Sequence, residues 1–329
     1  MKYIHSTIIC VFSAILFACD SNSCDDGPDV SGIPMEVEIE RLDQEMFSLR
    51  SEEEIAAFLD KYPQVSSQFL NAGQYPDDSL LINAIQNIIT DPYIDTLYRE
   101  TQQTFGSLED VEAQFETAFR HIKYYFPEFE PPKIYAAFTA LGTIGSDLLI
   151  SEDAIVISIE YYLGKDARFR PDVYDYMIGR YTPEHMVPSI IMFMSDRWNQ
   201  VEGNTLLSEM IYYGKSYYFT EKMLPCLTDT IVAGYSAEEL SIAEDNVQLV
   251  WSHFVEKELL YETSHIIKPK YVGERPTTLE INPKIPGRIG RWLGWQIVKD
   301  YVEETDNSLP ELMRQEDAQQ IFMQAKYRP

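Results

Sequence analysis

Residues 203–225 read G-N-T-L-L-S-E-M-I-Y-Y-G-K-S-Y-Y-F-T-E-K-M-L-P, and this stretch predicts a long helix at the centre of the domain. The helix should begin after the polar pair Asn204–Thr205 and end at Pro225, because no proline interrupts it between these points. Its apolar side chains recur at helical spacing, which predicts one buried face. These side chains are Leu206, Met210, Tyr213, Tyr217, Met223 and Leu224.

Glu209 stands where a helix with the H-E-x-x-H motif carries the general base of a zinc peptidase. In that motif two histidines four residues apart bind zinc, and the glutamate activates a metal-bound water. Here Ser208 and Tyr212 occupy the two ligand positions, and neither is an ordinary zinc ligand. If this is a peptidase helix, it has lost its metal, and we expect no cofactor and no catalytic residue.

The N-terminal segment Met1–Ala18 predicts a signal peptide, because its apolar run Ile8–Phe17 is shorter than the ~20 residues that span a bilayer. The run ends in Leu16-Phe17-Ala18-Cys19, which is typical of a bacterial lipobox. We therefore expect Cys19 to carry the acyl chains that attach the protein to a membrane. The alternatives are an ordinary secretory signal followed by a chance cysteine, or a short anchor.

Residues 19–33 predict a flexible tether, since they are rich in Ser, Asn, Asp, Gly and Pro. A single globular domain should follow at residues 34–329. Cys24 lies in the tether and Cys226 lies far downstream; a disulfide between them would suit an oxidising compartment, but we expect none.

Composition and charge limit the functions open to this domain. Hydrophobic residues make up 45% of the 329 residues, which is enough for a sizeable core. The formal net charge of −27 disfavours nucleic-acid binding, which depends on neutralising phosphates. The same charge is repelled by anionic lipid, so the lipid on Cys19, and not a basic patch, should hold the protein at the membrane.

The pattern along the chain predicts an α+β fold, mainly α-helical with a small central sheet. Strands are expected at residues 35–41, 133–139 and 154–159. Helices are expected at residues 51–62, 80–89, 93–104, 107–126, 171–180, 182–198, 236–261, 287–304 and 309–327. Capping residues support several of these starts, among them Ser51, Ser107 with Asp110, and the Ser236–Glu239 capping box. Residues 268–286, with four prolines, predict a long loop of the kind that is often functional.

Most sequence features suggestive of catalysis are better explained by structure. The four histidines beyond the signal peptide are scattered, and no G-x-S-x-G or phosphate-binding glycine loop occurs. Adjacent carboxylates in so acidic a chain indicate solvated helix faces and caps. Four tyrosine pairs could line a groove for a peptide or glycan, although packing at the rim of a core is favoured. The pairs are Tyr124–Tyr125, Tyr161–Tyr162, Tyr212–Tyr213 and Tyr217–Tyr218.

Residues 286–298 read P-G-R-I-G-R-W-L-G-W-Q-I-V, with glycines at spacings of three and four. A helix face without side chains lets another helix approach closely, despite a cost of about 1 kcal/mol per glycine. We expect this helix to cross the 203–225 helix, with Arg288 and Arg291 paired to Glu209 or Glu244. The less favoured interpretation is an arginine-lined groove for an acidic group of a partner, formed by Arg288, Arg291, Trp292 and Trp295.

Several motifs resemble the gliding motility lipoprotein GldB family of Bacteroidetes. Besides the lipobox and the 286–298 segment, they are Y-Y-F-P at 124–127, I-S-I-E-Y-Y-L-G at 157–164, I-Y-Y-G-K at 211–215 and A-K-Y-R-P at 325–329. The resemblance implies an envelope lipoprotein required for gliding and associated with other gliding and type IX secretion proteins. It also implies a distant likeness to zincin-like peptidases, in which Ser208 and Tyr212 replace the histidine ligands and Glu209 keeps the base position.

Three functional hypotheses follow. The leading one is a non-enzymatic component or scaffold of the gliding and secretion machinery, lipid-anchored to an envelope membrane with its domain in the periplasm. The second is a metallopeptidase with atypical ligands, such as His253 or His265 with Glu209 and Glu244. The third is an envelope lipoprotein that binds a peptide or glycan through the tyrosine groove.

Overall fold

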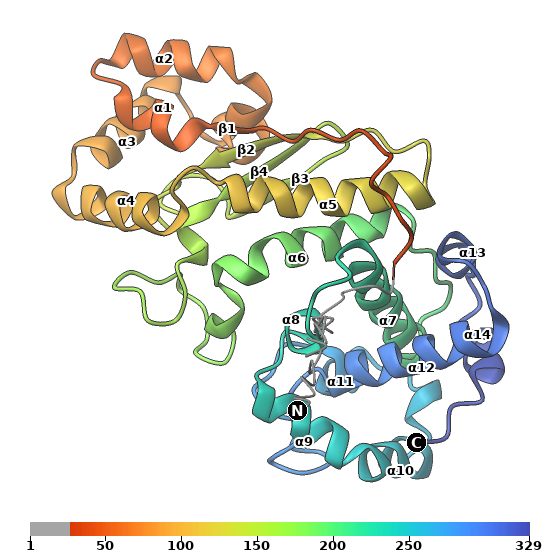
Figure 1. The fold of residues 1–329 in the computed structure, drawn as a ribbon. Coiled ribbons are helices and arrows are strands. Elements are labelled where there is room, and N and C mark those ends of the chain that lie inside the picture. The colour runs from red at the N-terminus through yellow and green to blue at the C-terminus, as the bar shows by residue number, and fades with distance from the viewer. Residues whose placement is uncertain (1–26) are drawn as a thin grey trace, which may run out of the picture.

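The computed structural model describes residues 27–329, so the predicted signal peptide and the lipid site at Cys19 lie outside the described part. The fold is mainly helical with one small mixed sheet, as the sequence predicts (Figure 1). The strands are β1 (Ile39–Arg41), β2 (Lys133–Ala137), β3 (Leu148–Ile150) and β4 (Ala154–Ser158). The first helices are α1 (Leu42–Ser48), α2 (Glu52–Lys61), α3 (Asp78–Thr90), α4 (Pro92–Phe105) and α5 (Glu109–Tyr125). After the sheet come α6 (Pro183–Met194), α7 (Leu206–Met223), α8 (Asp229–Ala233), α9 (Ala237–Asp245), α10 (Val247–Glu256), α11 (Pro269–Val272), α12 (Ile289–Thr305), α13 (Leu309–Arg314) and α14 (Ala318–Ala325).

The sheet has the strand order β1-β2-β4-β3, with β3 antiparallel at one edge and the other pairs parallel. Successive side chains of a strand point to opposite faces, so a buried strand contributes side chains to a core on each face of the sheet. Ile155 and Ile157 of β4 join the larger apolar cluster, which includes α5, α6, α7 and α12. Val156 joins the smaller cluster, which contains α1 to α4. In Figure 1, α5 accordingly lies along one face of the sheet while α1 and α2 lie on the other.

The segment before β1 lies along α5 instead of pairing with a strand. Arg120 donates to the carbonyl of Met35 at 3.0 Å, and Glu116 accepts from the backbone N–H of Val37 at 3.3 Å. These side chains of α5 occupy backbone groups that a ladder would need. The strand predicted at residues 35–41 is therefore confined to β1.

Local capping interactions fix the helix starts that the sequence predicts best. The Asp91 side chain accepts from the backbone N–H of Tyr93 at 2.7 Å, so α4 begins directly after α3 ends. Ser236 and Glu239 form the reciprocal capping box at the start of α9. Both interactions lie within three residues of the chain, which explains why the pattern alone reveals them.

Three predicted helices differ in the structure: residues 171–180 are turns apart from a 3₁₀ turn at Ile178–Arg180, residues 236–261 divide into α9 and α10, and residues 309–327 divide into α13 and α14. The last break follows from a competing cap, because Asp317 accepts from the N–H groups of Gln319 and Gln320 and starts a new helix. Asn246 similarly donates its side-chain amide to the carbonyl of Ile242 at the end of α9.

Two smaller expectations were also wrong, and one strand was not predicted. Leu108, in the left-handed region at φ 67°, precedes α5 without any side-chain cap, so Ser107 and Asp110 do not cap that helix. The edge strand β3 was not predicted. The expected loop at residues 268–286 contains the short helix α11.

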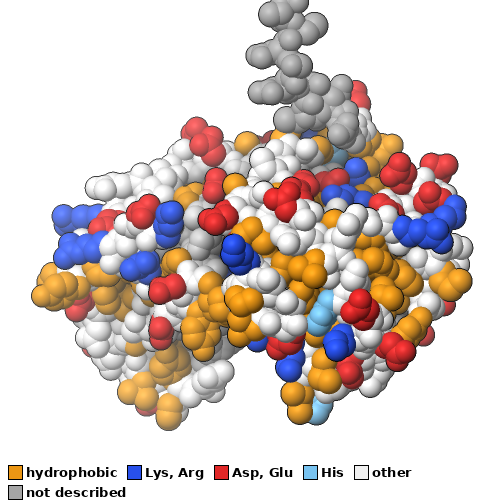
Figure 2. Space-filling view, turned by 90° about the horizontal axis from the view of Figure 1, so that it is seen from below, with side chains coloured by type: hydrophobic (Ala, Val, Ile, Leu, Met, Phe, Trp, Pro, Cys, Tyr) orange, Lys and Arg blue, Asp and Glu red, His pale blue; other side chains and the backbone are white. Residues whose placement is uncertain are grey.

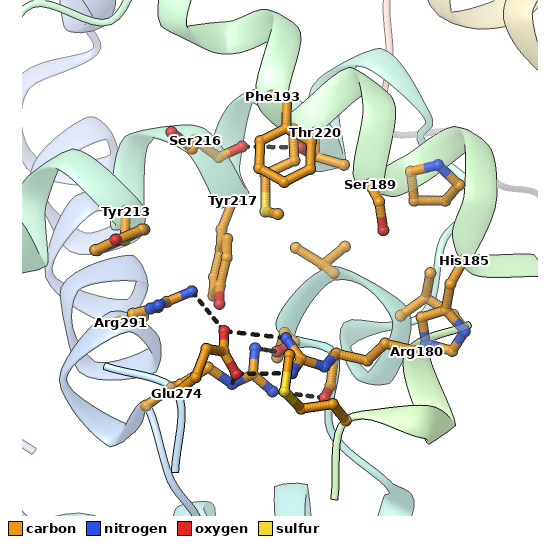
Figure 3. Close-up of a pocket in the computed structure, with 18 of the residues that line it drawn as sticks. Arg180, His185, Ser189, Phe193, Tyr213, Ser216, Tyr217, Thr220, Glu274 and Arg291 are labelled. Atoms are coloured by element: carbon orange, nitrogen blue, oxygen red, sulfur yellow. Dashed lines mark hydrogen bonds and ion pairs between the residues drawn. The ribbon is translucent and has the colours of Figure 1, made fainter. Parts of the chain in front are cut away.

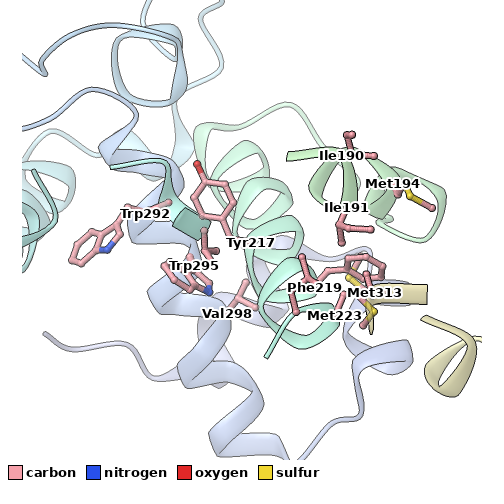
Figure 4. Packing of buried hydrophobic residues seen from close by; sticks show 14 of the residues in the cluster. Ile190, Ile191, Met194, Tyr217, Phe219, Met223, Trp292, Trp295, Val298 and Met313 are labelled. Atoms are coloured by element: carbon pink, nitrogen blue, oxygen red, sulfur yellow. The ribbon is translucent and has the colours of Figure 1, made fainter. Parts of the chain in front are cut away.

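The crossing of α7 and α12 is confirmed (Figure 4). A β-carbon at Gly294 would lie 1.9 Å from the carbonyl oxygen of Met210, and one at Gly214 would lie 2.4 Å from the carbonyl of Gly294. The two backbones therefore touch where both glycines meet. Beside this contact the rings of Tyr217 and Trp295 pack edge to face, with centroids 5.9 Å apart.

Lys215, next to Gly214 in the I-Y-Y-G-K motif, is fully buried. Its ammonium group donates to the carbonyls of Gln200, Met313 and Gln315 at 2.8, 3.1 and 2.9 Å. A buried amine needs such acceptors, and these carbonyls need a donor. Lys215 thus joins α7 to the turn between α13 and α14.

Cys226, just after α7, is disulfide-bonded. The sequence analysis expected no disulfide between Cys226 and Cys24, and Cys24 lies outside the described part of the chain. Within residues 27–329, no helix is both long and apolar enough to cross a membrane. Acidic side chains are spread among apolar ones over the face shown in Figure 2.

Candidate functional site

A cavity of about 430 Å³ lies between α6, α7 and α8, and residues 274–291 close one side of it (Figure 3). The helices contribute both polar and aromatic side chains to its wall. These include His185, Ser189 and Phe193 from α6, and Tyr213, Ser216, Tyr217 and Thr220 from α7. Figure 3 shows Arg180, Glu274 and Arg291 gathered at one end of the cavity.

Three guanidinium groups surround the single carboxylate of Glu274. Arg180 donates to its two oxygens at 3.2 and 2.7 Å. Arg291 lies 3.3 Å from one oxygen, and Arg288 lies 3.7 Å from the other. Because one carboxylate cannot satisfy the donors of three guanidiniums, this end of the cavity retains capacity for a further acceptor.

Arg288 is fixed by its backbone and by the end of α8. It precedes α12 in the left-handed region at φ 60°, and its side chain is buried. Its guanidinium donates to the carbonyls of Ala233 at 3.0 Å and Gly234 at 2.7 Å. A cation at the carboxyl end of a helix satisfies otherwise unpaired carbonyls, so Arg288 is held rigidly.

Arg291, one turn into α12, is positioned by different contacts. Its Nε donates to the carbonyl of Val272 at 2.5 Å. Its guanidinium carbon lies 4.1 Å from the ring centroid of Tyr213 on α7, a cation–π contact. The α7–α12 crossing brings these two side chains together.

The charges around the cavity set the protonation of its titratable groups. Burial alone would raise the pKa of Glu274, but the hydrogen bond from Arg180 and the charges of Arg288, Arg180 and Arg291 hold that pKa below its ordinary value. Burial lowers the pKa of His185, and the nearby Arg180 and Arg288 lower it further against the opposing effect of Glu184. At neutral pH the site therefore contains an ionised Glu274 and an uncharged His185.

Two further acids, Asp147 and Asp196, also line the cavity. Asp196 accepts from the hydroxyl of Tyr212 at 2.5 Å, so it is engaged with a neutral donor and not with an arginine. Burial first, and then this bond, raise the pKa of Tyr212. The cavity is thus polar throughout, with its guanidinium groups concentrated around Glu274.

The three degenerate peptidase positions do not come together at this cavity. Ser208 is buried, with its hydroxyl 2.9 Å from that of Thr205 at the start of α7. Glu209 forms an ion pair of 2.6 Å with Lys268. Only Tyr212 lines the cavity, because it lies a turn further along the helix.

The predicted groove residues are divided between the cavity and the core. Arg288 and Arg291 line the cavity, whereas Trp292 and Trp295 are buried with exposures of 4% and 0%. The prediction that these arginines pair with Glu209 or Glu244 was wrong. The actual partner is Glu274, which the intervening α11 segment places beside α12.

The sequence did not reveal Arg180 and Glu274 as partners, because 94 residues separate them. The sequence placed Glu274 in the 268–286 segment, a predicted long loop of the kind that is often functional. Some of the paired tyrosines do line the cavity. Tyr162, Tyr212, Tyr213 and Tyr217 line the cavity.

Two of the atypical metal ligands considered from the sequence are engaged in other contacts. His253 lies 3.0 Å from the hydroxyl of Tyr271, and Glu209 is paired with Lys268. In the part of the chain that the structure describes, no three His, Cys, Asp or Glu side chains are grouped to hold a metal ion. His253 and Glu209 thus belong to no metal-binding group among the described residues, while the arginine end of the cavity fits an anionic group.

The fold and the cavity define a mainly helical α+β protein with an arginine-lined cavity. The family model for gliding motility protein GldB matches residues 23–329, so the chain belongs to this family of gliding motility lipoproteins. Comparisons with curated proteins and with solved structures gave no match.

Proposed function

We propose that this protein is a non-enzymatic, lipid-anchored component of the gliding and type IX secretion machinery, with its domain in the periplasm. Its cavity binds an acidic group of a partner protein in that machinery. Family membership supports the role in gliding. The observation that carries the binding role is the set of three guanidiniums around Glu274, since arginines arranged in this way suit carboxylates.

The contacts of the degenerate peptidase positions support a scaffold over a peptidase. A general base must reach a water or substrate, yet Glu209 is paired with Lys268 and does not line the cavity. Ser208 belongs to the cap of α7. The domain is on this proposal an inactive, peptidase-like scaffold.

The test is complementation of a gliding strain from which the gene has been deleted. We expect the deletion to abolish gliding and the wild-type gene to restore it. Arg180→Ala should fail to restore gliding, because it removes the bidentate donor beside Glu274. Glu209→Gln should restore it fully, since the amide keeps a hydrogen bond to Lys268 and no chemistry depends on the carboxylate.

The matched control is Arg99→Ala, which removes an exposed arginine of α4 paired only with Asp95. It should restore gliding, with all variants at wild-type level by immunoblot. Normal gliding of the deletion strain would rule out the motility role. Normal gliding with Arg180→Ala would rule out the cavity as the binding site, and loss of gliding with Glu209→Gln would favour a peptidase.

A further inference from the structure

The N-terminal end of the described chain lies against the carboxyl ends of α5 and α7. A β-carbon at Gly27 would lie 3.2 Å from Cγ of Pro225 and 3.4 Å from Nε2 of His121. The chain at Gly27 is therefore held beside the end of α7 by packing.

The length of chain before Gly27 limits how the domain can face a membrane. Cys19, the expected lipid site, precedes Gly27 by eight residues. Even a fully extended segment of that length spans at most about 28 Å. A folded domain of this size is about 50 Å across, so the face opposite Gly27 cannot reach the bilayer.

Tyrosines occupy the surface next to this attachment point. Tyr125 lies one turn from His121 on the same face of α5, and its ring is 5.0 Å from that of Tyr124. Tyr124 is 48% exposed. Tyr218 of α7 lies near Tyr125. Burial raises the pKa of Tyr218, and the charges of Glu221 and Tyr125 raise it further.

Both lysines at this end lie beside a carboxylate, so neither offers an unpaired positive charge. Lys123 pairs with Glu130 at 2.8 Å, and Lys222 lies 3.6 Å from Glu221. The ammonium group of Lys222 also lies 5.1 Å from the ring centroid of Tyr218. A surface rich in tyrosine suits the boundary between headgroups and acyl chains, where an amphipathic ring has both an apolar and a wet side.

We propose that the carboxyl ends of α5 and α7 form the membrane-facing surface of the protein, with Tyr124, Tyr125 and Tyr218 in the headgroup region. The bilayer is the one that carries the protein's own acyl chains, so this inference rests on the proposed lipidation of Cys19. Thr220 of the cavity wall lies within about 8 Å of Pro225 along α7. The partner that enters the cavity therefore meets the protein close to the membrane.

The test uses the full-length lipidated protein in vesicles of phosphatidylcholine with brominated acyl chains, which quench tryptophan fluorescence at short range. Tyr124→Trp places a reporter at the proposed surface, where the exposed ring can be exchanged without disturbing the core. Tyr93→Trp is the matched control, since Tyr93 is 73% exposed on α4, which packs on the smaller apolar cluster. The wild-type protein, with its four tryptophans, supplies the background.

We expect the added fluorescence of Tyr124→Trp to be quenched several-fold more than that of Tyr93→Trp. Equal quenching, or stronger quenching at position 93, in protein that floats with the vesicles would overturn the orientation and leave the lipid anchor intact. Protein that does not float with the vesicles would overturn the anchor and the orientation together.

Discussion

Glu160 brings a fully buried carboxyl group to the end of β4. One oxygen accepts from the backbone N–H of Thr139 at 2.7 Å, from its hydroxyl at 2.9 Å and from the N–H of Leu141 at 3.2 Å. The other oxygen is buried without a hydrogen-bond partner. Burial raises the pKa of Glu160 to about 7, although the bonds from Thr139 and Leu141 oppose the shift.

This raised pKa predicts a pH-dependent stability. Between its ordinary value of 4.5 and about 7, the folded protein keeps a proton on Glu160 that the unfolded chain has released. The free energy of unfolding should therefore fall as pH rises through this window, by on the order of 3 kcal/mol from this residue. Glu160→Gln should remove that loss, because the amide keeps the accepting oxygen and does not titrate.

Urea unfolding from pH 4.5 to pH 8 measures the effect as the difference between wild type and variant. The exposed Glu238→Gln of α9 is the control, and its curve should parallel that of wild type. Parallel curves for wild type and Glu160→Gln would show that Glu160 is ionised throughout the window.

At the scale of elements, the α7–α12 crossing is the contact on which the cavity depends. It sets the position of Arg291 against Tyr213 and brings Arg288 to the end of α8. The close approach is possible only because Gly214 and Gly294 have no side chains where the backbones meet.

Gly294→Ala should therefore destabilise the protein, even though alanine is the better helix former by about 1 kcal/mol. Its methyl group would overlap the carbonyl of Met210, so the helices must separate, at a cost of about 1–3 kcal/mol or more. The midpoint of urea unfolding measures the change. Gly73→Ala makes the same substitution where nothing lies within 4 Å, and it should leave the midpoint almost unchanged. Equal midpoints for the two variants would contradict the close crossing.

At the scale of the whole molecule, we expect the proposed lipid, and not surface charge, to hold this chain of net charge −27 at a membrane. Cys19→Ala should then move the protein from the membrane fraction to the soluble fraction, while the domain stays folded. Cell fractionation with immunoblotting measures this distribution. Cys10→Ala, the same change inside the signal peptide, should leave the protein in the membrane fraction, and a wild-type distribution of Cys19→Ala would contradict lipidation at this residue.

Elements that depend on contacts between residues close in sequence could be predicted, whereas elements that depend on distant contacts could not. The starts of α4 and α9 depend on Asp91 and on Ser236 with Glu239, whose contacts span no more than three residues. The edge strand β3 depends on pairing with β4, and its three apolar residues carry no alternation of their own. Local patterns cannot show such a pairing.

The sequence by itself determined the helical class of the domain, the small sheet, the glycine crossing and the family, because each is written in short motifs or in periodicity. Only the tertiary structure decided which side chains share the cavity. Arg180 and Glu274 meet across 94 residues, while Trp292 and Trp295, next to the cavity arginines in sequence, turn into the core. The physical reason is that successive residues of a helix point in different directions, so the packing of α12 on α7 selects which face is buried and which meets the cavity.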